Sequence, residues 1–160
     1  MFQRIVVPLD GSELAERALP EASDLGRITS APIHVVRVVD LGRLEGNGSL
    51  TFGVFPWSVQ HALDDEERSA RAYVERVCLT LGRHGMVASC EVRLGDAARE
   101  IIAATGTGDV VVMATHGRGG VSRWYLGSVA EAVARHASGP VMLIRATAVE
   151  TGSDEPGTTA

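Results

Sequence analysis

The sequence predicts an α/β fold, in which a five-stranded parallel sheet of order 3-2-1-4-5 carries helices on both faces. Short, continuous apolar runs alternate along the chain with longer segments of helical character, and parallel neighbours in a sheet need crossover helices between them. The 160 residues, 45% of them hydrophobic, suffice for one core. We therefore expect a single domain over residues 1–146 and a flexible polar tail over residues 147–160.

The chain is expected to open with a buried strand and a helix. Residues 4–9 form a nearly continuous apolar run, which is typical of a strand covered on both faces. Asp10 and Gly11 break this run, and Ser12 can cap a helix that continues to about Arg27. Pro20 lies inside that helix and should kink or interrupt it.

The remaining elements continue the alternation. The run that ends at Ala114 is the clearest strand in the chain, while Gly85 closes the longest helix and Asp96 introduces the next. We expect strands over residues 33–39, 87–94, 109–114 and 141–145, and helices over residues 64–84, 97–105 and 127–137.

A long connection over residues 41–62 separates the second strand from the longest helix. It carries three aromatic residues, Phe52, Phe55 and Trp57. Loops of this length in compact domains are often functional. Folding back onto the globule, covering a ligand and joining an oligomer contact all remain open for it.

Composition excludes several classes of protein. All fifteen basic residues are arginine and face twenty acidic ones, which disfavours a nucleic-acid binder and removes every mechanism that needs a lysine. No apolar run approaches the roughly 18–20 residues that span a bilayer, and no secretory signal is visible, so we expect a cytoplasmic protein. The two cysteines, Cys78 and Cys90, lack metal-like spacing and are expected to be reduced, packed thiols.

A ligand site is expected beyond the carboxyl ends of the first and fourth strands, where the winding of the sheet reverses. Residues 8–12 and 114–120 meet there. The second segment is rich in glycine and leads to a helix near Gly127, whose backbone N–H groups and dipole suit a phosphate. The glycines alone are equally typical of turns, and Arg118 and Arg123 either assist an anion or stay solvated.

The spacing Ala114-x2-Gly117-x9-Gly127-Ser128 resembles the G-x2-G-x9-G-[S/T] signature of the universal stress protein family, in its ATP-binding branch. The motifs Ile-Val-Val-Pro-Leu-Asp-Gly-Ser and Gly-Pro-Val-Met-Leu-Ile-Arg look like the same family, and the resemblance covers about residues 3–146. It implies a Rossmann-like fold of the adenine nucleotide hydrolase type, a homodimer, and a role in surviving stress. Ala114 departs from the signature, which has glycine there; the methyl matters if φ is positive or a phosphate lies very close.

The resemblance also implies a cofactor site for ATP, or for ADP or AMP, with Mg²⁺ or Mn²⁺ carried by the phosphates. It places Asp10 at the ribose and Val38 beside the adenine through its backbone. The other implied binding residues are Pro8, Met113 and Ala114 at the entry of the site, and Gly117, Gly127, Ser128 and Val129 at the phosphates. We expect Gly127 to leave no room for a branched side chain.

Catalysis is not expected. His116 lies near the expected phosphates but has no paired nucleophile and no carboxylate placed to orient it, so the logic of a catalytic triad fails. The histidines also lack metal-binding spacing. Slow ATP hydrolysis is compatible with this expectation, and Asp10 is equally typical of turn chemistry.

Three functions compete at this stage. The first is a cytoplasmic, ATP-binding regulatory module of the stress response with an unknown protein partner, and without nucleic-acid or membrane binding. The second is an adenylyl-transferring enzyme, although residues 8–12 lack the adjacent glycines that such an enzyme uses. The third is a stress-family interaction module without nucleotide, which Ala114 favours. Residues 141–145 are expected to form an apolar sheet edge, and this predicts a homodimer through that strand; the alternative is that the tail or the 41–62 loop covers the edge within one chain.

Overall fold

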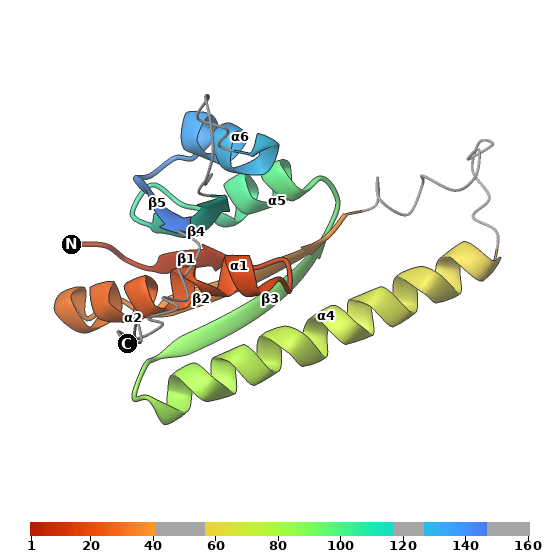
Figure 1. Ribbon diagram of the computed structural model, residues 1–160, viewed down its shortest axis with the longest axis horizontal. Helices are drawn as coiled ribbons and strands as arrows, with labels where there is room; N and C mark the ends of the chain where they lie inside the picture. The colour runs from red at the N-terminus through yellow and green to blue at the C-terminus, as the bar shows by residue number, and fades with distance from the viewer. Residues whose placement is uncertain (41–56, 117–126, 147–160) are drawn as a thin grey trace, which may run out of the picture.

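The computed structural model describes residues 1–40, 57–116 and 127–146 of the chain. Strands and helices alternate as expected (Figure 1). In chain order they are β1 (Ile5–Pro8), α1 (Glu13–Glu16), α2 (Ala18–Thr29), β2 (Ile33–Val39), α4 (Trp57–Arg83), β3 (Ala88–Leu94), α5 (Ala97–Ala104), β4 (Val110–His116), α6 (Ser128–His136) and β5 (Val141–Ala146). The predicted tail, residues 147–160, lies outside the described residues.

The five strands form one parallel sheet of order β3-β2-β1-β4-β5, which confirms the predicted fold class. β1 is the central strand: Ile5 lies opposite Ile33 of β2 on one side and opposite Val110 of β4 on the other. All four residues of β1 are buried, as its apolar run predicts. The winding reverses between β1 and β4, so a crevice is expected at their carboxyl ends.

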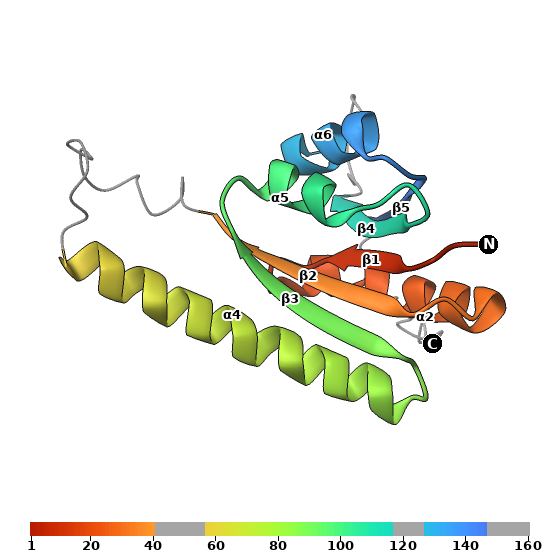
Figure 2. The same ribbon diagram turned by 180° about the vertical axis from the view of Figure 1, so that it is seen from behind.

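Helices cover both faces of the sheet (Figures 1 and 2). α1, α2 and α4 pack on the face that carries Val7 and Val35, and α5 and α6 pack on the face that carries Val6 and Val36. Neighbouring residues of a strand point to opposite faces, which is why Val6 and Val7 belong to different cores. Within the described residues, no helix is long and apolar enough to cross a membrane.

The helix predicted from Ser12 onward is two helices, α1 and α2, which meet at Arg17. Pro20 explains the break, because it has no N–H to give the carbonyl of Glu16 and its ring crowds that carbonyl. The interruption therefore falls one turn before the proline, which sits in the first turn of α2. Ser12 caps α1 as predicted, since its hydroxyl accepts a hydrogen bond of 3.1 Å from the N–H of Ala15.

α4 begins at Trp57, not at Asp64, so the predicted loop over residues 41–62 is wrong from Trp57 onward. The acidic run at Asp64 suits a first helical turn and therefore resembled a helix start. Instead, the side chain of Gln60 donates a 3.0 Å hydrogen bond to Asp64 one turn later and supports the longer helix. Residues 41–56, with two of the three aromatic residues, lie outside the described part of the chain.

The two cysteines are free thiols that pack together between α4 and β3. Burial, together with a hydrogen bond and the charge of the neighbouring Cys90, raises the pKa of Cys78 to about 12. This thiol stays protonated at neutral pH and is therefore a poor nucleophile. The structure agrees with the expected packed thiols and adds a contact between them that their spacing did not indicate.

Candidate functional site

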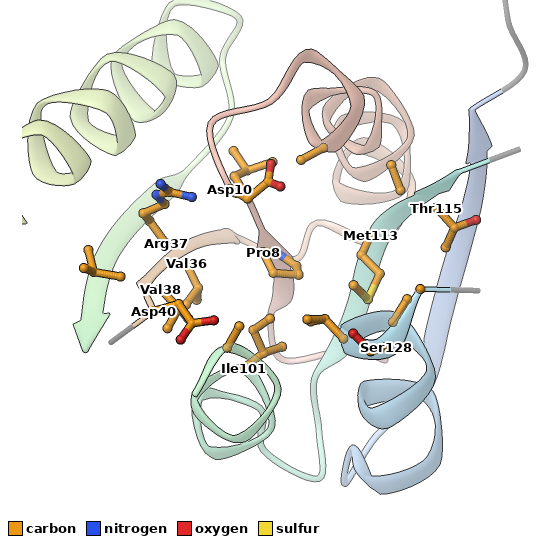
Figure 3. A pocket seen from close by; sticks show the side chains of 18 of the residues that line it. Pro8, Asp10, Val36, Arg37, Val38, Asp40, Ile101, Met113, Thr115 and Ser128 are labelled. Carbon is orange, nitrogen blue, oxygen red and sulfur yellow. The ribbon is translucent and has the colours of Figure 1, made fainter. Parts of the chain in front are cut away.

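A pocket of about 550 Å³ lies beyond the carboxyl ends of β1, β2 and β4, at the predicted reversal of the sheet (Figure 3). Residues of α1, α4, α5 and α6 complete its walls. Apolar side chains such as Val36, Val38 and Ile101 line it together with polar side chains from several elements. Its volume suits a ligand of nucleotide size.

Eight of the nine predicted binding residues line this one pocket. They are Pro8, Asp10, Val38, Met113, Ala114, Gly127, Ser128 and Val129. The ninth, Gly117, lies outside the described residues, as do Arg118 and Arg123. The structure thus brings together residues that are more than 100 positions apart in the sequence, because β1 and β4 are neighbours at the centre of the sheet.

The N-terminus of α6 forms one wall of the pocket. Gly127 precedes it with φ +77° and ψ 138°, and no side chain caps the helix. Its carbonyl accepts the first helical bond, from Glu131, so the N–H groups of residues 128–130 have no partner inside the helix. Unpaired N–H groups and the positive end of the helix dipole favour an anion at this wall.

The backbone of Gly127 has a conformation that favours glycine. A Cβ added there would meet nothing within 4 Å among the described residues, so the expected lack of room for a branched side chain concerns the bound phosphate and stays a prediction. Its φ of +77° lies in the left-handed region, which residues with a Cβ rarely adopt. The backbone turn into α6 therefore requires the glycine by itself.

Asp10 follows β1 and holds the turn that leads into α1. Its Oδ1 accepts a 2.9 Å hydrogen bond from the N–H of Ser12 and a second bond from the Ser12 hydroxyl. Burial opposes ionisation of Asp10, but these two bonds and the charge of Arg37 outweigh it and hold the pKa of Asp10 below its usual value. Asp10 is therefore an ionised carboxylate at neutral pH, both a turn residue and a wall of the pocket.

Ala114, the departure from the family signature, lies inside β4. It pairs with Ile144 of β5, and the strand continues as far as His116. Ser30 is the only non-glycine residue with positive φ in the described part of the chain, so position 114 does not need a glycine for its backbone. Only a close approach of a ligand could make the methyl of Ala114 matter. The side chain of His116 lies outside the described residues.

Three charged residues of the pocket, Arg37, Asp40 and Glu66, were missed by sequence reasoning. Arg37 Nη2 lies 3.3 Å from Glu66 Oε1, which joins the end of β2 to α4. An arginine inside the apolar run of β2 is a signal that could have been noticed. Glu66 carried no signal, because it is one of many acids on a long exposed helix.

The charge of the pocket is mixed. Asp10, Asp40 and Glu66 face a single cationic side chain, Arg37, among the lining residues that the structure describes. Across all the described residues, no cluster of three histidine, cysteine, aspartate or glutamate residues could hold a metal ion by itself. Carboxylates at one end suit hydroxyl and amino donors, and the α6 N-terminus at the other suits an anion.

An open parallel sheet with helices on both faces and a ligand-sized crevice where the strand order reverses defines the class of doubly wound α/β folds that bind nucleotides. A family model described as the Universal stress protein family matches residues 1–145, and the chain belongs to this family. Universal stress protein MJ0531 of Methanocaldococcus jannaschii is 28% identical over 152 residues, which cover 91% of this chain and 83% of that protein.

Solved structures share the fold. The hypothetical protein MJ0577 superimposes with a TM-score of 0.75 at 21% identity, covering 92% of this chain and 99% of that one. A universal stress protein from Archaeoglobus fulgidus, solved in complex with dAMP, has a TM-score of 0.51 at 18% identity, covering 89% and 97%. Another universal stress protein, solved in complex with cAMP, has a TM-score of 0.55 at 17% identity, covering 91% and 98%.

Proposed function

We propose that this chain is a cytoplasmic ATP-binding universal stress protein, a regulatory module of the stress response whose partner contacts depend on its nucleotide. The observation that carries the proposal is the convergence of Asp10, Val38 and the uncapped α6 N-terminus on one pocket of nucleotide size. The dAMP and cAMP complexes of two relatives with the same fold support an adenine nucleotide as the ligand class.

The walls of the pocket match the parts of a nucleotide. Val38 and Ile101 offer an apolar surface for the base, and Asp10 offers an ionised acceptor for ribose hydroxyls. The N–H groups at the start of α6 and the Ser128 hydroxyl suit phosphates. These groups would take the place of a lysine side chain, which the sequence lacks. Mg²⁺ or Mn²⁺ would be carried by the phosphates of ATP.

A regulatory role fits these residues better than catalysis does. Asp10 already accepts two hydrogen bonds from Ser12, and its lowered pKa makes it a weak general base. Ser128 starts α6, and among the described lining residues no histidine or lysine stands ready to activate it. Slow turnover of bound ATP by water is compatible with this role.

Mass analysis of the small molecule released by acid from freshly purified protein tests the proposal. An adenine nucleotide at near-stoichiometric yield, together with saturable binding of Mg-ATP in calorimetry, is the expected result. The second candidate, an interaction module without nucleotide, is favoured by Ala114 alone. It predicts no released nucleotide and no binding of ATP, ADP or AMP at millimolar concentration.

A further inference from the structure

Arg37 joins three elements that meet at one side of the pocket. Its guanidinium pairs with Glu66 of α4 at 3.3 Å and carries the positive charge that faces Asp10 after β1. The Arg37 side chain is 17% exposed and that of Glu66 is 45% exposed, so the guanidinium is largely shielded from solvent while the carboxylate is not. Figure 3 shows Arg37 and Asp10 on the same side of the pocket, away from Ser128.

The part of α4 that carries Glu66 buries little apolar surface. Residues 60–69, here called the α4 arm, include no buried residue, and Ala70, which follows them, is buried. Figures 1 and 2 show the start of α4 projecting past the carboxyl ends of β2 and β3. A segment with so little buried apolar surface opens at a low free-energy cost.

Firm packing of α4 begins beyond the arm. Val74 and Leu81 belong to the buried core, and the Tyr73 hydroxyl donates a 2.9 Å hydrogen bond to Glu16 of α1. The arm itself is held as a helix by local pairs such as Arg68 with Asp65 and Arg71 with Glu67. These local pairs support the helix, and the pair between Arg37 and Glu66 attaches the arm to β2.

We propose that Arg37 is a positioning residue of the nucleotide site and that its pair with Glu66 couples nucleotide binding to docking of the α4 arm. The inference rests on the proposed function and names how that site is regulated. The docked arm completes the pocket wall and keeps Arg37 beside Asp10, the residue proposed at the ribose. A nucleotide therefore binds the docked state more tightly than the undocked one.

Because the coupling is an equilibrium property, it acts in both directions: the nucleotide docks the arm, and docking raises nucleotide affinity by the same factor. We expect a factor of about three to ten, at the lower end of measured couplings because Glu66 is partly exposed. The surface presented by the start of α4 would then report whether the pocket is filled.

Hydrogen–deuterium exchange with and without Mg-ATP tests the coupling on nucleotide-free full-length protein. In the wild type, amides of residues 60–69 should exchange about three- to tenfold more slowly with Mg-ATP. Glu66→Gln should abolish this protection and weaken Mg-ATP binding by a similar factor. Glu67→Gln is the matched control, because Glu67 makes the same kind of pair with Arg71 but does not line the pocket. The Glu67→Gln variant should keep both the protection of residues 60–69 and the wild-type affinity for Mg-ATP.

A second pair of variants separates positioning from direct phosphate contact. Arg37→Met should weaken Mg-ATP and adenosine by the same factor, because its effect passes through the ribose end, and Arg37→Lys should recover most of the loss by restoring the charge. Weakening of Mg-ATP alone would show a phosphate contact and overturn the positioning role. Equal protection of the arm in the Glu66 and Glu67 variants would overturn the coupling.

Failure of the proposed function gives a different result from failure of this inference. If the wild type binds neither Mg-ATP nor adenosine, the nucleotide site itself is wrong and the coupling is overturned with it. If the wild type binds Mg-ATP while residues 60–69 exchange at an unchanged rate, the site stands and only the coupling is overturned.

Discussion

The backbone conformation of a single residue, Gly127, shapes the proposed phosphate site. Its φ of +77° directs the chain into α6 so that the first N–H groups of the helix line the pocket. Gly85, after α4, has almost the same φ of +78° and equally open surroundings, but it lies away from the pocket. Substitutions at the two glycines therefore compare backbone strain beside the pocket with backbone strain away from it.

We predict that Gly127→Val abolishes ATP binding while the protein stays folded. A β-branched residue at φ +77° and ψ 138°, a sparsely populated conformation, costs about 1–3 kcal/mol and moves the N–H groups that face the phosphates. Gly85→Val should lose a similar amount of stability in urea denaturation and keep its ATP affinity in calorimetry. If Gly127→Val folds and binds ATP as the wild type does, the phosphates lie elsewhere.

Substitution of Asp10 can separate its proposed contact with the ribose from its role in the turn before α1. Asp10→Ala should weaken ATP binding by about 1–3 kcal/mol, because hydrogen bonds to an ionised acceptor are lost. ATP analogues without both ribose hydroxyls should then bind the wild type and the variant about equally. An equal loss for those analogues in calorimetry would mean that Asp10 acts only by holding Ser12 and the start of α1.

At the scale of elements, Asp109 links the beginnings of β1 and β4. Its carboxylate, 2% exposed, accepts hydrogen bonds from Arg4 Nε at 3.2 Å and Arg4 Nη2 at 2.6 Å, and a further bond from the N–H of Gly106. Arg4 also donates to the carbonyl of Ala104 at the end of α5. One ion pair thus joins two central strands and a helix.

Asp109→Asn should destabilise the protein by about 1–3 kcal/mol at pH 7, measured by urea denaturation. Asp24→Asn, which breaks the exposed pair with Arg27, should cost only a few tenths of a kcal/mol and serves as the control. Burial raises the pKa of Asp109, but its bonds with Arg4 and Gly106 outweigh burial and lower it. A cost that is equally small for both variants would contradict the structural role given to this pair.

The lowered pKa of Asp109 also determines how the stability difference between the wild type and Asp109→Asn depends on pH. The stability that Asp109 contributes is fully present above its pKa in the unfolded chain, about 3.9, and is lost as the pH falls through the lower pKa of the folded state. The gap between the wild type and Asp109→Asn should therefore persist from pH 7 to about pH 5 and shrink on further acidification. A gap that widens toward acid would contradict the assigned shift.

Sequence patterns predicted the elements well where a single local rule dominated. The apolar runs of β1, β2 and β4 and the cap at Ser12 needed no tertiary information. The start of α4 was missed because no typical capping residue precedes Trp57 in the sequence, and the supporting bond from Gln60 to Asp64 has no local signature. In the pocket, motif residues were found by their spacing, but the pair of Arg37 with Glu66 depends on how α4 crosses the sheet and has no local signature.

At the scale of the whole molecule, the two edges of the sheet differ in chemistry. β3 carries charges along its length, with Arg93 donating to both Glu91 and Glu100. Charges on an edge strand discourage pairing with another sheet. β5 is apolar from Val141 to Ile144, and its Met142 side chain is 39% exposed. The predicted homodimer through residues 141–145 therefore uses the edge that has the weaker protection.

Parallel pairing shows which amides of β5 are available to a second copy. The N–H of Val111 donates to the carbonyl of Pro140, and Val112 lies opposite Met142. In a parallel ladder, alternate residues of a strand bond to the same neighbour, so the N–H of Met142 points to β4 and that of Leu143 points outward. A proline at each position removes one of these donors and leaves the other.

We predict that Met142→Pro damages folding, because it removes a bond to β4, whereas Leu143→Pro gives a folded monomer, because it removes a bond across the two-fold contact. Leu143→Ala is the control for the lost side chain and should remain a folded dimer. Light scattering after size exclusion gives the mass, about twice 16.9 kDa for the wild type, and circular dichroism reports the fold. Neither a wild-type mass near 16.9 kDa at tens of micromolar nor a folded dimer with Leu143→Pro is compatible with antiparallel pairing of two β5 strands. Either result would place the edge of β5 outside any interface.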